Sequence, residues 1–150
     1  MARILALDDS ATILEFVRAL LCDHEVVACT DWVDANRRIH QGDIDLVVVD
    51  QELEQFQGTF FVRAIRGFFG INLPVVVLSG KDVEDEALGA GATAFLSKER
   101  SDLLPALIER VLRCPNRGAC VLVVDGGRVE CRSCAGGRFA PGEDVTGTHI

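Results

Sequence analysis

The chain has 150 residues, about the length of one ordinary domain, so a second full domain does not fit. Hydrophobic residues make up 49% and charged residues 25%, which supports a buried core and excludes a disordered or collagen-like chain. The formal charge of −8 repels phosphate backbones and acidic membranes, so we expect no nucleic-acid partner and no membrane partner. No apolar run approaches the ~20 residues that cross a bilayer, and no export signal precedes the first acids. We therefore expect a cytoplasmic protein.

Five short runs rich in valine, isoleucine and leucine occur along the chain, and such runs are typical of strands buried on both faces. They are residues 3–9, 25–30, 45–50, 74–79 and 93–98. Apolar residues at helical spacing lie between them, as in residues 13–21, and follow the last run in residues 104–111. Strand and helix alternate five times, which predicts an α/β fold with a doubly wound, five-stranded parallel sheet.

Two serines mark expected helix starts. Ser10 precedes the first helical segment and Ser101 the last, where a side-chain oxygen can accept an unpaired backbone N–H. Pro105 then falls in the first turn of the last helix, where proline is tolerated. The apolar positions of residues 103–112 cover more surface than one sheet face needs. We expect the C-terminal tail to cover the surplus, with a homodimer partner as the alternative.

The composition changes at Cys114. Residues 114–150 hold seven of the 14 glycines and four of the six cysteines, so we expect a domain over 1–113 and a cysteine-rich extension over 114–150. Within the extension, two β-prone runs flank the sequence Asp-Gly-Gly at 125–127, whose residues tolerate positive φ. Residues 120–131 are therefore predicted to form a β-hairpin.

Polar side chains end the predicted strands. The ends of the first, third, fourth and fifth strands carry, in order, Asp8 with Asp9, Asp50, Ser79 and Lys98. In a doubly wound sheet these ends meet at one edge. Three carboxylates there repel one another and favour a hard cation with oxygen ligands, which indicates Mg²⁺, while a lone ammonium and a hydroxyl suit a phosphoryl group. The alternative is that each acid only caps a helix.

With these residues in place, residues 1 to about 113 resemble a response-regulator receiver domain. The acidic pair, Asp50, Ser79 and Lys98 match the family's strand ends, and Gly58 matches its turn glycine eight residues after Asp50. The resemblance implies a flavodoxin-like strand order 2-1-3-4-5 and Asp50 as phosphoacceptor. It also implies Mg²⁺ on Asp8, Asp9, Asp50 and the Glu52 backbone carbonyl, phosphoryl contacts from Lys98 and Ser79, and a switch role for Phe95.

Some positions depart from the family pattern. Leu53 and Glu54 stand where the family often has methionine and proline, and Glu99 replaces the usual proline after the lysine. Phe95 lacks the hydroxyl of the commoner tyrosine, so a switch here would act through ring burial. Glu52 and Lys81 flank the site, and we hypothesise that they form an ion pair over it that slows hydrolysis.

The resemblance predicts a stand-alone receiver that takes a phosphoryl group from a sensor histidine kinase or a phosphotransfer protein. It would act on an unidentified downstream protein, with a homodimer as a further option. It would dephosphorylate itself and would not be a dedicated enzyme. One alternative is an aspartyl-nucleophile phosphatase of the haloacid dehalogenase type, although residues 8–10 lack that family's Asp-x-Asp. Another is a receiver-like scaffold whose zinc-bound hairpin is the binding module.

Six cysteines in a chain with no export signal favour thiols over disulfides. Cys22 and Cys29 are predicted to be buried small hydrophobes. Cys131 and Cys134 form a C-x-x-C, and with Cys114 and Cys120 they are candidates for a structural Zn²⁺ site, with free thiols or a disulfide as alternatives. Four phenylalanines at 60, 61, 68 and 69 are expected to be mostly core.

Overall fold

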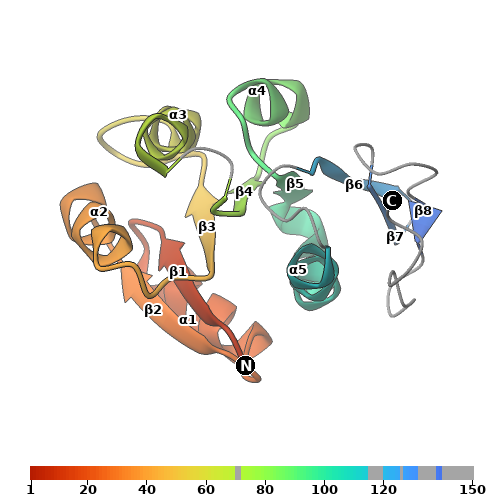
Figure 1. Ribbon diagram of the computed structural model, residues 1–150, viewed down its shortest axis with the longest axis horizontal. Coiled ribbons are helices and arrows are strands. Elements are labelled where there is room, and N and C mark those ends of the chain that lie inside the picture. The colour runs from red at the N-terminus through yellow and green to blue at the C-terminus, as the bar shows by residue number, and fades with distance from the viewer. Residues whose placement is uncertain (70–71, 115–119, 126, 132–137, 140–150) are drawn as a thin grey trace.

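One mixed sheet crosses the molecule, with helices on both faces (Figure 1). The computed structural model describes residues 1–69, 72–114, 120–125, 127–131 and 138–139. Its strands are β1 (Arg3–Leu7), β2 (Glu25–Cys29), β3 (Leu46–Asp50), β4 (Val75–Ser79), β5 (Ala94–Ser97), β6 (Leu122–Asp125), β7 (Arg128–Cys131) and β8 (Arg138–Phe139). Its helices are α1 (Ala11–Leu20), α2 (Trp32–His40), α3 (Gly58–Phe69), α4 (Glu84–Gly89), the 3₁₀ turn η1 (Lys98–Leu103) and α5 (Leu104–Arg113).

The first five strands are parallel and lie in the order 2-1-3-4-5, so the predicted fold is confirmed. Strands β3 and β4 are buried along their whole length, because helices pack on both faces of this part of the sheet. Continuous runs of valine therefore suit these central positions better than an alternating pattern would.

The sheet does not end at five strands. Strand β6 runs parallel to β5, with Leu122 opposite Ala94, and the Leu122 N–H donates to the Thr93 carbonyl at 2.8 Å. Strand β7 then pairs antiparallel with β6, which confirms the predicted hairpin, and Gly127 in its turn has a φ of 85°. The cysteine-rich extension thus lengthens the parallel sheet to eight described strands, an outcome that the expected five-stranded sheet did not include.

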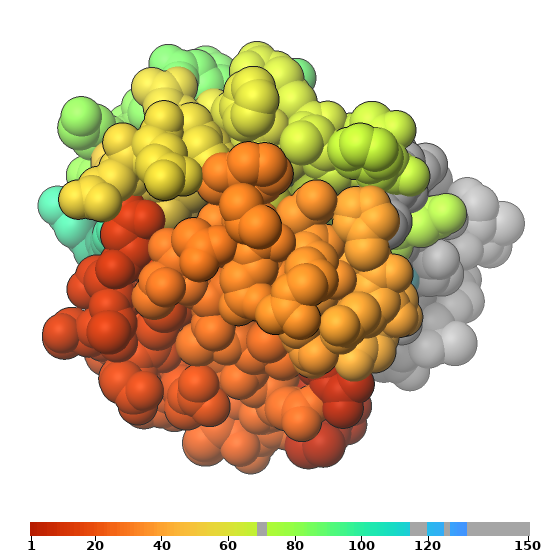
Figure 2. All heavy atoms as spheres, turned by 90° about the vertical axis from the view of Figure 1, so that its left-hand side faces the viewer, coloured from red at the N-terminus to blue at the C-terminus, as the bar shows by residue number. Residues whose placement is uncertain are grey.

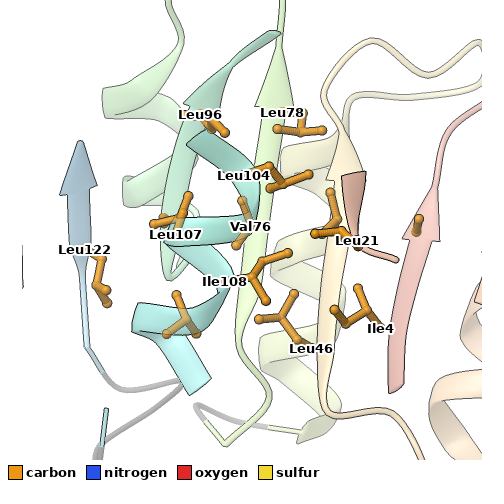
Figure 3. Packing of buried hydrophobic residues seen from close by; sticks show 14 of the residues in the cluster. Ile4, Leu21, Leu46, Val76, Leu78, Leu96, Leu104, Leu107, Ile108 and Leu122 are labelled. Carbon is orange, nitrogen blue, oxygen red and sulfur yellow. The ribbon is translucent and has the colours of Figure 1, made fainter. Parts of the chain in front are cut away.

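Two apolar layers sandwich the sheet. Helices α1 and α5 pack on one face, where Leu104, Leu107 and Ile108 contact the strands (Figure 3). Helices α2, α3 and α4 cover the other face. The residues of the extension that join the α1/α5 layer are Cys114, Cys120, Leu122, Val129 and Cys131. The surplus apolar surface of α5 is therefore covered by the tail, as expected.

One of the two predicted helix caps is confirmed. The Ser10 hydroxyl accepts the Ile13 N–H at 3.3 Å at the start of α1. Ser101 caps nothing, because it lies inside η1; the Ser97 hydroxyl caps that turn by accepting the Glu99 N–H at 3.2 Å. Helix α5 begins at Leu104 with Pro105 in its first turn, as predicted.

Two burial predictions are wrong. Cys22 is exposed just beyond α1, whereas Cys29 on β2 is buried as predicted. On α3, Phe61 is buried but Phe60 and Phe68 are 62% and 72% exposed, because they lie on the helix face that points away from the sheet. Helix α3 lies above α2 in Figure 2, which views the molecule from the β2 end. The Phe69 side chain lies outside the described residues.

No helix in the described ranges is both long enough and apolar enough to cross a bilayer.

Candidate functional site at the carboxyl ends of the strands

The predicted site residues come from four neighbouring strands. Asp50 is the last residue of β3 and Ser79 the last of β4, while Asp8 directly follows β1 and Lys98 directly follows β5. Because these strands are parallel and adjacent in the order β1-β3-β4-β5, their carboxyl ends share one edge. The topology, not the local sequence, makes neighbours of residues up to 90 positions apart.

Lys98 and Asp50 form the central ion pair. The Lys98 Nζ lies 2.8 Å from the Asp50 Oδ1. Burial raises the pKa of Asp50, an effect only partly offset by Lys98 and by the Glu52 backbone. Burial lowers the pKa of Lys98, but the Asp50 carboxylate outweighs it and the net pKa is raised. Each charge of the pair favours the other, and the lysine nitrogen lies directly against the acid.

Asp8 is the second buried carboxylate of the site. Its Oδ1 accepts the Ser10 N–H at 2.8 Å. Burial raises the pKa of Asp8, and the nearby charges of Asp50 and Asp9 raise it further. Asp8 and Asp50 thus repel each other in a buried place where one ammonium offsets their charge.

Asp9 lies at the same edge but its carboxylate turns away. It is exposed, and its Oδ2 accepts the backbone N–H of Glu54 in the loop after β3. Among the described residues, no three carboxylates have oxygens that all lie within 4.8 Å of one another. The structure therefore brings Asp8 and Asp50 together, and it uses Asp9 to hold the loop after β3.

The donor set at this edge fits Mg²⁺. Magnesium is a hard cation that takes oxygen ligands and usually keeps several waters, with one or two carboxylates from the protein. Asp8 and Asp50 offer two carboxylates whose burial and mutual repulsion a cation would relieve. Asp9 lies at the same edge and adds a nearby negative charge that raises the pKa of Asp8.

Ser79 is fully buried and is held by Glu52. Its hydroxyl donates to the Glu52 Oε2 at 2.7 Å, and the Gly80 N–H donates to the Glu52 Oε1 at 3.2 Å. No ion pair of the described residues joins Glu52 to Lys81, so the hypothesised pair over the site is not present. Lys81 touches the site only through its backbone N–H, which donates to the Ser79 hydroxyl at 3.0 Å.

The loop after Asp50 is fixed by contacts that sequence reasoning missed. The Thr59 N–H donates to the side-chain oxygen of Gln51 at 2.9 Å, and the Gly58 N–H donates to the Gln51 carbonyl at 2.9 Å. A Cβ atom at position 58 would lie 2.4 Å from the Asp50 carbonyl oxygen. The glycine spacing signalled this turn, whereas nothing local in the sequence marks Gln51 or Thr59 as its anchors.

An aromatic group beside Asp9 was also not anticipated. Trp32 packs edge-on against Phe56 with ring centres 6.1 Å apart, and Phe56 lies 5.4 Å from Phe60. Trp32 and Phe56 line a cavity of about 180 Å³ together with Asp9 and Glu54. These rings come from the start of α2, from the loop after β3 and from α3, so only the fold brings them together.

Phe95, the expected switch residue, is buried on β5 and packs in the α2/α3/α4 layer. It also lines a cavity of about 180 Å³ that includes Ser97 and Val124. Val124 belongs to β6, so the cysteine-rich extension reaches the neighbourhood of the expected switch. The separate reading of the two parts of the sequence did not predict this contact.

Three of the four candidate zinc ligands come together. The sulfurs of Cys114, Cys120 and Cys131 all lie within 4.8 Å of one another, and all three residues are buried. The Cys114 and Cys120 sulfurs are 3.0 Å apart. Cys134 lies outside the described residues.

Comparisons of the sequence agree with this geometry. The sequence model of the response regulator receiver domain matches residues 4–109. A protein-glutamate methylesterase/protein-glutamine glutaminase of Rhodopseudomonas palustris is 33% identical over 116 residues, which cover 71% of this chain and 31% of that protein. A protein of the same description from Hydrogenovibrio crunogenus is 31% identical over 110 residues, which cover 67% of this chain and 29% of that protein. The chain spans under a third of the length of these curated relatives.

Solved structures show the same architecture. The chemotaxis response regulator CheY4 of Vibrio cholerae superposes with a TM-score of 0.60 at 29% identity, covering 65% of this chain and 87% of that one. A two-component response regulator of the LuxR family from Aurantimonas sp. gives a TM-score of 0.66 at 28% identity, covering 75% of this chain and 85% of that one. The chain belongs to the response regulator receiver domain family.

Proposed function

We propose that this chain accepts a phosphoryl group on Asp50 from a phosphohistidine of a sensor histidine kinase or a phosphotransfer protein. The observation that carries the proposal is the ion pair of Lys98 with Asp50, in which a lysine nitrogen lies 2.8 Å from a buried carboxylate at the end of the central strand. Membership in the receiver family supports a place in two-component signalling.

The proposed reaction is an in-line displacement at phosphorus. An Asp50 carboxylate oxygen attacks, the bond between phosphorus and the donor's imidazole nitrogen breaks, and that nitrogen keeps the electron pair. Asp50 becomes an acyl phosphate. Lys98 then pairs with a phosphoryl oxygen, and the Ser79 hydroxyl donates to another once it leaves Glu52.

The metal would supply charge neutralisation between the acids and the incoming phosphoryl group. Asp8 and Asp50 would hold it, with Asp9 directly or through water. The Glu52 backbone carbonyl is the further ligand proposed by resemblance to the family.

The proposed output is a protein contact. Movement of Ser79 toward the phosphoryl group would leave room for Phe95 to shift behind it, which alters the surface formed by α4 and β5. Stand-alone action on a downstream protein, self-dephosphorylation without a dedicated enzymatic activity, homodimer formation and a cytoplasmic location are part of this proposal.

Intact-mass measurement tests the proposal. The protein is incubated with acetyl phosphate with and without Mg²⁺, beside the variants Asp50→Asn and Asp82→Asn. We expect the mass of one phosphoryl group to be added to the wild type and to Asp82→Asn, whose exposed acid lies near the same edge, only when Mg²⁺ is present. Equal labelling of Asp50→Asn would refute the assignment.

A further inference from the structure

Three buried thiols from separate segments meet outside the phosphoryl site. Cys114 directly follows α5, Cys120 lies just before β6, and Cys131 is the last residue of β7. Each of these residues is at most 3% exposed. The cluster therefore joins the end of a receiver helix to both strands of the added hairpin.

The spacing of the sulfurs suits a single tetrahedral ion. Thiolates at the usual Zn–S distance of about 2.3 Å sit about 3.8 Å from one another around zinc. The three sulfurs lie within 4.8 Å of one another, and those of Cys114 and Cys120 are 3.0 Å apart. Shifts of about an ångström or less would bring all three to ligand positions.

We propose that Cys114, Cys120 and Cys131 bind one Zn²⁺ that fastens the β6–β7 hairpin to the end of α5 and to the β5 edge of the sheet. Soft thiolate ligands select zinc over the hard cation expected at the acidic edge. All three residues are buried beside the apolar α1/α5 layer, which suits a structural role for the ion.

A metal cross-link would stabilise the β6–β7 hairpin because its strand pairing with the rest of the sheet is short. Within the described ranges, the single pair of Ala94 and Leu122 joins β5 to β6 in register, whereas four residue pairs join β4 to β5. Leu122 lies on the same side of the sheet as Leu107 of α5 (Figure 3), so apolar contacts help. A metal at the three thiols would add the cross-link that a short hairpin lacks.

Metal content of the purified full chain tests the proposal. We expect one zinc per chain in the wild type by native mass spectrometry and elemental analysis. The ion should be lost in Cys120→Ser and in Cys131→Ser. Cys29→Ser is the matched control, because Cys29 is an equally buried thiol in the opposite layer and the variant should keep the ion. Substitution with Co²⁺ should give the near-ultraviolet charge-transfer bands of thiolate ligands.

Hydrogen exchange on the wild type covers the case in which a cysteine variant fails to fold. A zinc chelator in excess Mg²⁺ should speed exchange of the β6 and β7 amides by more than about tenfold, while β3 and β4 stay protected. Zinc added back should restore protection.

Three results would overturn the proposal. They are a metal-free wild type with titratable thiols, a wild-type mass that shows a Cys114–Cys120 disulfide, and exchange that does not respond to the chelator. Phosphorylation of Asp50 in the same samples reports on the acidic site separately.

Discussion

Glu52 occupies the Ser79 hydroxyl, which the proposed phosphoryl group on Asp50 would need. Its carboxylate accepts the Ser79 hydroxyl and the Gly80 N–H, at 2.7 and 3.2 Å. A phosphoryl oxygen and a carboxylate oxygen compete for the same hydrogen-bond donors, so Glu52 must move when the group arrives. Breaking the hydrogen bonds of Glu52 would therefore raise the free energy of the transition state for phosphorylation as well as that of the phosphorylated product.

Removal of that carboxylate should speed phosphorylation. We expect Glu52→Ala to react with acetyl phosphate about tenfold faster, which corresponds to ~1.4 kcal/mol, the scale of one hydrogen bond to a charged group. Glu54→Ala removes the same charge from the same loop and should react like the wild type. Stopped-flow fluorescence of Trp32 or intact mass against time gives the rates. A matching acceleration in Lys81→Ala would instead favour the ion pair that the structure lacks.

Asp8 stores unfavourable electrostatic free energy in the folded state. Burial raises its pKa above the ordinary value of 3.8, so the native protein holds this proton more tightly than the unfolded chain does. The contribution of Asp8 to stability is therefore greatest below about pH 4, and it is lost as pH rises through the native pKa.

The variant Asp8→Asn should raise the Tm by a few degrees at pH 7 and leave it nearly unchanged below pH ~3.8, where both side chains are neutral. Thermal unfolding across this pH range, beside Asp23→Asn, checks the expectation, because Asp23 is an exposed acid with the same charge. Saturating Mg²⁺ should stabilise the wild type and have little effect on Asp8→Asn. A lower Tm for Asp8→Asn at pH 7 would contradict the argument.

At the scale of the element, α3 contains two glycines with opposite roles. Gly58 begins the helix against the Asp50 carbonyl, where a Cβ would be 2.4 Å from the oxygen. Gly67 lies near its far end, where a Cβ would have nothing within 4 Å. The first glycine lets the loop after Asp50 close, and the second only weakens the helix.

Alanine at the two positions should therefore have opposite effects. We expect Gly58→Ala to destabilise the protein by ~1–3 kcal/mol through overpacking, and Gly67→Ala to stabilise it by ~0.5–1 kcal/mol. Urea unfolding monitored by circular dichroism measures both. Gly58→Ala should also slow phosphorylation, since the carbonyl it displaces belongs to Asp50. Equal stability of the two variants would show that the loop relaxes freely.

For the whole molecule, the extension brings a new strand next to the expected switch. Phe95 on β5 and Val124 on β6 line one cavity of about 180 Å³. The Leu122 N–H bonds to the Thr93 carbonyl, two residues before Phe95. A shift of the Phe95 ring would therefore change the shape of a cavity that β6 also lines.

Phosphorylation should accordingly reach the hairpin. With beryllofluoride and Mg²⁺ as the phosphoryl mimic, amide exchange of residues 121–125 should change in the wild type and stay constant in Asp50→Asn. Strand β2, at the opposite end of the sheet, is the internal control. Changes limited to the residues around Asp50 would place the output elsewhere than the hairpin.

The sequence by itself determined the five parallel strands, their helices and the residues that end them. Valine-rich runs, such as residues 46–49, can only be satisfied between two helical layers, and parallel strands place their carboxyl ends on one edge. The order of acid, acid, hydroxyl and lysine along the chain thus predicted that Lys98 and Asp50 share one edge of the sheet, and the structure adds their ion pair. The hairpin and the thiol group were predicted as well, from turn residues and cysteine spacing.

Only the tertiary structure decided how the parts meet. Glu52 accepts a hydrogen bond from Ser79 instead of pairing with Lys81, Asp9 holds the loop after β3, and β6 continues the sheet beyond β5. Each of these features depends on distances between segments far apart in the chain. Exposure of Phe60 and Phe68 likewise follows from the direction in which α3 faces the sheet. Local patterns fix what each segment forms, because backbone and burial preferences are local, whereas side-chain partners across segments are fixed by packing.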